Sequence, residues 1–306
     1  MGKHSAISWT DATFNPWWGC VEVAKECDNC YARTFDRRVG GAHWGKDAPR
    51  RFFGDKHWNE PLRWDRDAHA TYGRNARVFC ASMADVFEDR NDLDEARARL
   101  WKLIEATPNL DWLLLTKRPQ NYLRMVPEAW RDGFPSNVWA GTTCGHSESL
   151  WRVDALRKVP AAIRWVSVEP MLEDVSSMSL AGIAWAIYGG ESGSKRPMDA
   201  AWVRRGIASC RSVGAAPFVK QMGARTLVPY YGGDDPDSDY WDWRDNREAE
   251  RVLVDGREWQ EHEGQPPPRA LAEIRWGAAK GDDPSEWPPD MRAQEFPDAA
   301  ARAKPR

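Results

Sequence analysis

Residues 111–116 read DWLLLT, a short apolar run that ends in a hydroxyl residue and is followed by Lys117 and Arg118. Nearly continuous apolar runs of this length are typical of parallel strands that are covered on both faces. The same pattern recurs along the chain, and each run ends in or beside polar residues. The other runs are ARVFCASM (76–83), NVWAGTT (137–143), IRWVSVE (163–169), IAWAIYGGE (183–191) and PFVKQMG (217–223).

Helical patterns lie between these runs. Asp92, Ser147 and Asp199 each precede apolar residues at helical spacing, so each is predicted to cap the N-terminus of a helix, and Gly214 closes the third. Successive strand–helix–strand units form a parallel sheet with right-handed crossovers. No early strand is followed by the Gly-rich turn of a dinucleotide-binding fold. We therefore predict an α/β protein built on a partial (β/α) barrel, not a doubly wound sheet.

The carboxyl ends of parallel strands meet at one edge of such a barrel, which we call the mouth, and (β/α) enzymes assemble their sites there. Charged residues stand at several of these ends. Glu169 and Lys220 directly abut buried runs, where an unpaired charge is costly, so they favour a functional site over chance. Asp85, Lys117, Arg118, Gly189, Gly190 and Glu191 are predicted to lie at the same edge.

Three cysteines lie close together near the start of the chain. Residues 14–32 read FNPWWGCVEVAKECDNCYA, which gives the spacing Cys20-x6-Cys27-x2-Cys30. A [4Fe-4S] cluster held by three cysteines leaves one iron open, whereas a structural zinc site needs four ligands. His43 or Cys144 would supply a fourth ligand for zinc, and chance clustering of buried thiols is the remaining interpretation.

Composition limits the function classes. The net charge is −3, but residues 224–306 carry 12 Lys and Arg against 19 Asp and Glu, which leaves 31 against 27 in residues 1–223. This mild excess permits binding of a polyanion without indicating a dedicated nucleic-acid binder. The 19 tryptophans favour core packing, with a base-stacking platform as the alternative.

We predict two parts, a barrel with its cysteine loop in residues 1–223 and an irregular Trp-, Asp- and Pro-rich C-terminal extension in residues 224–306. The extension is expected to pack on the barrel through its tryptophans, with a frayed end after about residue 298. RVLVDG (251–256) is its one strand-like stretch and RALAEI (269–274) its one helical stretch. Neither a signal peptide nor a run of ~20 apolar residues is found, so a cytoplasmic protein without membrane contact is expected.

Several motifs resemble a phage-encoded family of three-cysteine-motif proteins, which in turn is similar to distant radical S-adenosylmethionine (SAM) enzymes. The resemblance runs in order over nearly the whole chain and would place the protein in a host cytoplasm. Its motifs are ISWTDATFNPWWGCVEVAKECDNCYA (7–32), WNEPLRW (58–64), LLLTKRP (113–119), WVSVEPML (165–172), YGGESG (188–193), PFVKQMG (217–223) and GDDPSEWP (281–288).

The resemblance implies a first strand at Ala6–Trp9 and a [4Fe-4S] cluster on Cys20, Cys27 and Cys30 that cleaves SAM to methionine and a 5′-deoxyadenosyl radical. The usual radical SAM spacing is Cys-x3-Cys-x2-Cys, so only the second half matches. An electron donor and a nucleic-acid base or nucleotide substrate would complete the reaction. The residues implied for cofactor binding are Asp85, Gly189, Gly190 and Glu191, and those implied for catalysis are Lys117, Glu169 and Lys220.

Two other functions remain open at this point. A zinc-binding module would use its tryptophans to bind nucleic acid or a protein without catalysis. A (β/α) hydrolase or nuclease would place a divalent metal among Asp85, Glu169 and Glu191 and would keep the cysteines as structural residues.

Overall fold

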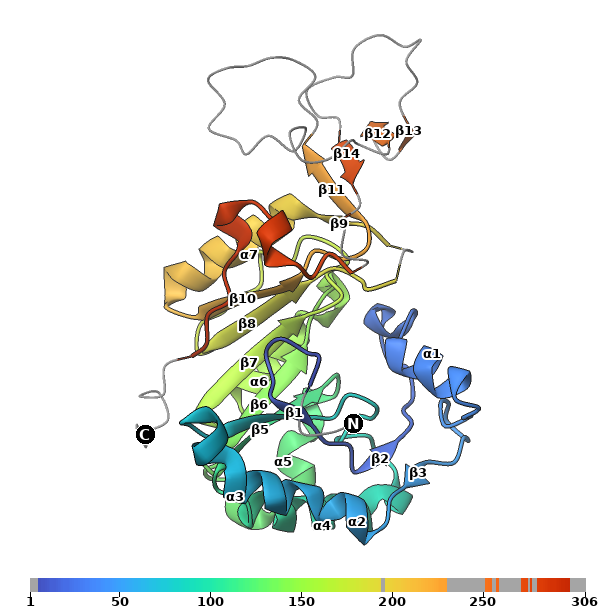
Figure 1. Cartoon of the computed structure of the whole chain (residues 1–306), viewed down its shortest axis with the longest axis vertical. Coiled ribbons are helices and arrows are strands. Elements are labelled where there is room, and N and C mark those ends of the chain that lie inside the picture. The colour runs from blue at the N-terminus through green and yellow to red at the C-terminus, as the bar shows by residue number, and fades with distance from the viewer. Residues whose placement is uncertain are drawn as a thin grey trace.

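The computed structural model describes residues 5–193, 196–229, 251–254, 257–258, 271–274, 276 and 280–297. Its centre is a seven-stranded sheet in the order β1-β4-β5-β6-β7-β8-β10, in which every neighbouring pair is parallel. Figure 1 shows this sheet curling along its length. The predicted partial (β/α) barrel is therefore confirmed. The strands are β1 (Ala12–Thr13), β4 (Ala76–Cys80), β5 (Leu110–Thr116), β6 (Val138–Thr143), β7 (Ile163–Val168), β8 (Trp185–Gly189) and β10 (Ala216–Gln221).

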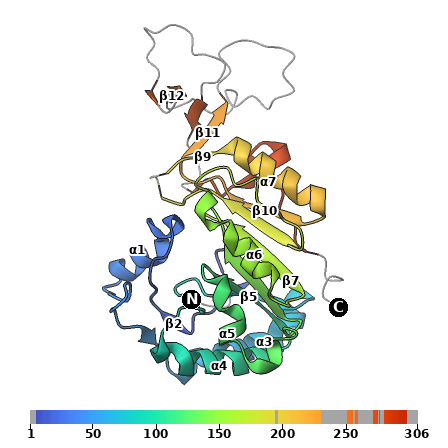
Figure 2. The same cartoon turned by 180° about the vertical axis from the view of Figure 1, so that it is seen from behind.

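Helices follow the strands and cover the outer face of the sheet (Figures 1 and 2). Asp199 caps α7 as predicted, since its carboxylate accepts the Ala201 N–H at 2.8 Å, and Gly214 ends the helix with φ +74°. Asp92 and Ser147 lie instead inside 3₁₀ turns that precede α4 and α6, so neither caps its helix. The helices are α1 (Tyr31–Arg38), α2 (Asp55–Trp58), α3 (Glu60–Tyr72), α4 (Asp94–Glu105), α5 (Tyr122–Met125), α6 (Trp151–Arg157) and α7 (Ala200–Val213).

Side chains alternate between the two faces of the sheet, as the period of a strand requires. One face packs under the helices in the large outer core, and the other forms a separate inner cluster. This inner cluster combines side chains from β4, β5, β6, β7, β8 and β10 with Trp9, and four of its members are tryptophans. The inner cluster consists of Trp9, Phe79, Leu113, Trp139, Ile163, Trp165, Trp185, Ile187 and Phe218.

Most of the tryptophans that the structure describes are buried, which confirms for them the prediction that they pack in the core. Thirteen of them are buried, and Trp151 is the large exposed exception at 48%. Trp241, Trp243 and Trp259 lie outside the described residues. The buried ones are Trp9, Trp17, Trp18, Trp58, Trp64, Trp101, Trp112, Trp130, Trp139, Trp165, Trp185, Trp276 and Trp287.

The first strand lies later than the resemblance implied. Ala6–Trp9 is not a strand, and β1 instead comprises Ala12–Thr13, which pair with Val78 and Phe79 of β4. Trp9 is 2% exposed because its ring packs at 4.7 Å from Phe79 and 5.5 Å from Trp165 in the inner cluster. The apolar residues that suggest a strand there therefore serve to pack the inner cluster.

The C-terminal extension contains more regular structure than predicted. A second sheet has the order β13-β12-β14-β11-β9, and the predicted helix at 269–274 is wrong because Leu271–Ile274 form β14 between two antiparallel neighbours. The strand expected at 251–256 is present as β12. The strands are β9 (Met198–Asp199), β11 (Thr226–Pro229), β12 (Arg251–Val254), β13 (Arg257–Glu258) and β14 (Leu271–Ile274).

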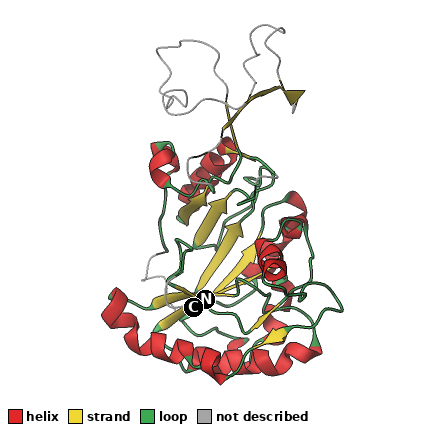
Figure 3. Cartoon of the chain, turned by 45° about the vertical axis from the view of Figure 1, so that its right-hand side comes forward, coloured by secondary structure: helices red, strands yellow, loops and turns green. Residues whose placement is uncertain are grey.

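Residues 280–297 return to the barrel and lie beside β10. The Val219 N–H donates to Ala293 O at 2.7 Å, and the Trp185 indole donates to Glu295 O at 2.9 Å. In Figure 1 this segment is drawn in red and lies next to α7, and Figure 3 shows the helices, strands and loops of the chain from another side. The boundary at residue 223 stays a prediction, and the expected frayed end lies outside the described residues. No described helix has the length and apolar character needed to cross a lipid bilayer.

Candidate functional site

The cysteine loop, residues 20–30, leaves β2 (Trp17–Trp18) over the carboxyl end of β4. The Gly19 N–H donates to Met83 O at 3.0 Å, and Gly19 has φ +112°. A Cβ at this position would lie 2.2 Å from His43 O, so only glycine lets the loop turn here. β2 pairs with β3 (Arg51–Phe52), which holds the other side of the turn. The loop therefore begins at the mouth of the barrel.

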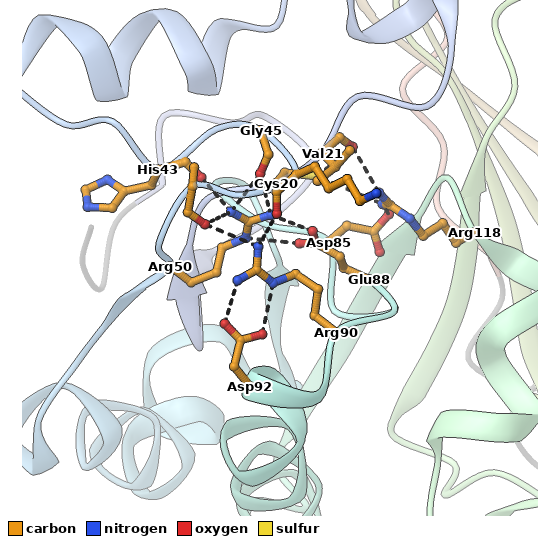
Figure 4. A network of polar contacts seen from close by, with 12 residues as sticks. Cys20, Val21, His43, Gly45, Arg50, Asp85, Glu88, Arg90, Asp92 and Arg118 are labelled. Atoms are coloured by element: carbon orange, nitrogen blue, oxygen red, sulfur yellow. Dashed lines mark hydrogen bonds and ion pairs between the residues drawn. The ribbon is translucent and has the colours of Figure 1, made fainter.

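Arg118, just beyond the end of β5, fixes the start of the loop. Its guanidinium pairs with Asp85 at 2.7 Å and donates to Val21 O at 2.9 Å, and its Nη1 lies 3.9 Å from Cys20 Sγ (Figure 4). The Arg118 and Asp85 side chains are only 10% and 8% exposed. Asp85 also accepts the Thr116 hydroxyl at 2.7 Å. This ion pair ties Cys20 to the ends of β4 and β5.

Glu26, between the first and second cysteines, fixes the middle of the loop. It accepts the Gly145 N–H at 3.1 Å and pairs with Arg152 at 3.3 Å, and both side chains are almost completely buried. Arg152 also donates to Thr143 O at 3.1 Å. The hydrogen bonds and Arg152 hold the pKa of Glu26 below its usual value despite the opposing effect of burial. The carboxylate is therefore charged and links the loop to the end of β6.

Glu191, which follows β8, fixes the last part of the loop. Its two carboxylate oxygens accept hydrogen bonds from the side-chain amide of Asn29, at 3.2 and 3.1 Å. The carboxylate also pairs with Arg196 at 2.5 Å. Arg196 also donates to Lys25 O at 3.0 Å and pairs with Asp28 at 3.2 Å. Asn29 stands between the second and third cysteines, so the Cys27–Cys30 turn is held by the end of β8.

A second network lies behind Cys20. Arg50, whose side chain is fully buried, pairs with Glu88 at 2.5 Å and donates to the carbonyls of His43, Gly45 and Ala48. The Gly45 N–H donates in turn to Cys20 O at 3.0 Å. In Figure 4 Arg50 lies among His43, Gly45 and Glu88. The backbone of Cys20 is thus supported from both sides.

The three thiols are free, with Cys27 buried and the other two half-buried. Burial raises the pKa of the Cys20 thiol to about 12, Asp85 adds to the rise, and Arg118 opposes it. Three sulfur donors on one irregular loop suit a soft, thiolate-bound group such as an iron–sulfur cluster. The described residues contain no group of three or more His, Cys, Asp or Glu side chains already spaced as a metal site. The donor chemistry of the three cysteines fits an iron–sulfur cluster.

The predicted catalytic residues Glu169 and Lys220 lie together at the mouth. Their side chains pair at 2.8 Å, and the Ser167 hydroxyl donates to Glu169 at 3.3 Å. A Cβ at Gly189 would come within 2.9 Å of Glu169 Oε1, so this glycine makes room for the carboxylate. Lys117 donates its backbone N–H to Asp85 and has a half-buried side chain.

The predicted cofactor-binding residues have partners within the chain. Asp85 holds Arg118, and Glu191 holds Asn29 and Arg196, as described above. A Cβ at Gly190 would lie 2.4 Å from Met222 O, so this glycine allows two backbone segments to approach closely. Their binding of a cofactor stays a prediction, and the structure gives each of them a role in positioning the mouth.

Both alternatives for a fourth zinc ligand are engaged elsewhere. His43 Nδ1 lies 2.7 Å from Asp36, and its ring points away from Cys20 in Figure 4. Cys144 is fully buried, and burial raises the pKa of its thiol to about 12. Among the described residues, neither is grouped with the three cysteines.

The carboxylates of the hydrolase hypothesis do not share a cation site. Asp85, Glu169 and Glu191 are each neutralised by a different cation, Arg118, Lys220 and Arg196 respectively. A divalent ion prefers several unneutralised oxygen ligands around one point. The arrangement therefore favours the cysteine loop as the candidate centre.

Sequence reasoning missed four residues that hold the loop: Glu26, Asn29, Arg152 and Arg196. Glu26 and Asn29 lie within the cysteine motif, where a charge or amide between ligands is a signal that the loop itself needs partners. Arg152 and Arg196 carry no comparable signal, because arginines near a helix or in a turn are usually solvated. Tyr31, next to Cys30, donates its hydroxyl to Ser82 O at 2.9 Å.

Comparisons with known proteins bear mainly on the family. A search of curated proteins found no match. A solved structure of a mutant spore photoproduct lyase is similar, with 12% identity and a TM-score of 0.38, over 71% of this chain. The match spans 65% of the lyase chain. A family model described as "Protein of unknown function (DUF5131)" matches residues 4–263. Since that range is most of the sequence, the chain belongs to the DUF5131 family.

Proposed function

We propose that this protein is a radical SAM-like enzyme in which Cys20, Cys27 and Cys30 hold a [4Fe-4S] cluster at the mouth of the partial barrel. The observation that carries the proposal is the way the cysteine loop is held. Three separate ion pairs, centred on Arg118, Glu26 and Glu191, link one loop to the carboxyl ends of β4, β5, β6 and β8. Chemistry on (β/α) barrels occurs at that edge.

Buried charges are costly, so their use around an irregular loop needs a reason. A loop that only connected two elements would need no such set of partners, whereas ligands of a metal group must be held within narrow limits. Arg118 and Glu26 position the first half of the motif, and Glu191 positions the second half through Asn29.

A bound cluster, given one electron by an external donor, would supply reductive cleavage of SAM to methionine and a 5′-deoxyadenosyl radical. The chain's own residues bind and orient the substrate. Lys117 and Lys220 would face its anionic groups, and the Glu169–Lys220 pair would bind its polar atoms at the mouth. The proposed substrate is a nucleic-acid base or nucleotide.

Substitution of the cysteines tests the ligand set. Protein reconstituted with iron and sulfide without oxygen should become brown, absorb broadly near ~400 nm and bind about four irons per chain. Cys20→Ala, Cys27→Ala and Cys30→Ala should each remove most of that absorbance, because every one deletes a ligand. The measurement is iron and sulfide content together with the absorbance spectrum.

Cys144→Ala and Cys210→Ala are the matched controls, since both thiols are fully buried in the core. Both should keep the cluster, and circular dichroism should show that all five variants are folded. Stoichiometric zinc in place of iron, lost in Cys144→Ala or His43→Ala, would mean that the cysteines form a structural zinc site instead.

A further inference from the structure

The three cysteines of the loop differ in their electrostatic surroundings. The Nη1 atom of Arg118 lies 3.9 Å from Cys20 Sγ (Figure 4). Among the residues that the structure describes, no side chain donates a hydrogen bond to the sulfur of Cys27 or Cys30. One of the three candidate ligands therefore has a guanidinium group against its sulfur, and the other two do not.

The guanidinium of Arg118 is fixed in this position. Its Nη2 donates to Val21 O at 2.9 Å, and its backbone N–H donates to the Thr116 hydroxyl at 2.8 Å. The side chain is only 10% exposed. A charge that is fixed and shielded from water acts on its neighbours more strongly than a solvated one. Arg118 is thus placed to act on the charge of a group bound through Cys20.

Asp85 limits how much of that positive charge reaches the sulfur. The Nη1 atom that contacts Cys20 also donates to Asp85 Oδ2 at 2.7 Å. Asp85 is itself held by the Thr116 hydroxyl at 2.7 Å and by the Phe87 N–H at 3.0 Å. One nitrogen therefore lies between a carboxylate and a thiol, and the carboxylate offsets part of the guanidinium charge.

The second buried ion pair near Cys20 is arranged differently. Arg50 pairs with Glu88, and its remaining N–H groups donate to the carbonyls of His43, Gly45 and Ala48. It supports the backbone of Cys20 through that segment, as described above. Within the described part of the chain, Arg118 is the arginine that contacts a sulfur of the loop.

We propose that Arg118 raises the reduction potential of a cluster bound through Cys20 and that Asp85 moderates this effect. The inference rests on the proposed function, because it requires a cluster on the three cysteines. An external donor supplies one electron, which adds one negative charge to the cluster, so a fixed positive charge beside a ligand stabilises the reduced form. Hydrogen bonds to the sulfurs and local charge are among the factors that set such potentials.

The competing role for the ion pair is mechanical support of the loop alone. Under that role, loss of either charged partner loosens the same loop, so the two losses shift the potential in the same direction or leave it unchanged. Electrostatic control predicts opposite signs. Loss of the Asp85 charge raises the potential, and loss of the Arg118 charge lowers it. The sign of each shift therefore separates the two roles.

A redox titration followed by electron paramagnetic resonance tests the proposal on the full chain, reconstituted without oxygen and titrated with dithionite and viologen mediators. Asp85→Asn keeps an acceptor oxygen for Arg118 and removes the negative charge. At a fixed potential its ratio of reduced to oxidised cluster should be about tenfold higher than that of the wild type, a shift of about 59 mV for one electron.

Adding Arg118→Gln to Asp85→Asn removes the guanidinium without leaving a buried charge. The ratio should fall again by about tenfold relative to Asp85→Asn alone. The midpoint is read from how the signal depends on potential, so partial occupancy by the cluster does not affect it. Asp85→Asn keeps the contacts of Arg118, so this single variant decides the proposal even where the double variant assembles no cluster.

Glu148→Gln is the matched control, since it removes a carboxylate whose partner, Lys25, lies in the same loop. The side chains of this pair are 49% and 67% exposed, so solvent screens them and the ratio should change by less than twofold. An Asp85→Asn midpoint equal to or below that of the wild type would overturn the proposal. A shift of the same size in Glu148→Gln would overturn it as well.

The titration also distinguishes this inference from the proposed function. A chain that assembles no cluster with its cysteines intact contradicts both. A cluster whose potential does not respond to Asp85→Asn contradicts only the role of Arg118. A cluster whose potential follows the ion pair but whose signal SAM leaves unchanged supports the role of Arg118 and contradicts only the use of SAM.

Discussion

Arg118→Leu should lower the free energy of unfolding by about 3–5 kcal/mol, because it leaves the Asp85 carboxylate buried without its cation. The same change removes the contacts to Val21 O and Cys20 Sγ, so the start of the cysteine loop loses its support from β5. Iron binding after reconstitution should fall along with stability. Urea unfolding followed by circular dichroism, together with iron content, measures both effects.

A double variant separates two effects of losing Arg118: the unpaired charge left on Asp85 and the lost support of the cysteine loop. Asp85→Asn with Arg118→Leu removes the unpaired charge, so it should regain part of the lost stability while cluster assembly stays impaired. Arg124→Leu breaks an exposed pair with Asp89 and should change neither quantity. An Arg118→Leu protein that assembles the cluster like the wild type would show that this arginine does not position Cys20.

Glu26→Leu should also cost about 3–5 kcal/mol, because Arg152 would be left buried and unpaired beside the end of β6. The Gly145 N–H would lose its acceptor as well. Glu26→Gln keeps an acceptor for that amide, so it should lose less. Chemical unfolding of both variants at neutral pH measures the difference.

Glu148→Ala is the natural control for Glu26. Glu148 pairs with Lys25, the residue next to Glu26, but both side chains are about half exposed or more. Removing this exposed pair should leave stability unchanged, since solvent screens it. If Glu26→Leu were as stable as Glu148→Ala, the loop would not depend on its buried partners.

Much of the barrel could be predicted from the sequence. The apolar runs at 111–116 and 163–169 match β5 and β7 within one residue, because strands buried on both faces need continuous apolar side chains. Short elements could not be predicted. β1 has two residues, too few for a pattern, and Leu271–Ile274 have helix-forming residues whose preference is overridden by pairing with β11 and β12.

The candidate site could be predicted only in outline. Strand ends placed Asp85, Arg118 and Glu191 at the mouth, since parallel strands share an edge. The sequence did not indicate that each of them holds the cysteine loop, because the partners are up to 162 positions apart in the chain. Pairing of buried charges depends on tertiary distances, which spacing within one segment does not encode.

The most direct test of the central claim is an electron paramagnetic resonance spectrum of the reduced, anaerobically reconstituted protein with and without SAM. The account predicts the signal of a reduced [4Fe-4S] cluster that changes shape when SAM is added, because three cysteine ligands leave one iron open to it. A cluster signal that SAM leaves unchanged, or a protein that assembles no cluster while its cysteines are intact, would contradict it.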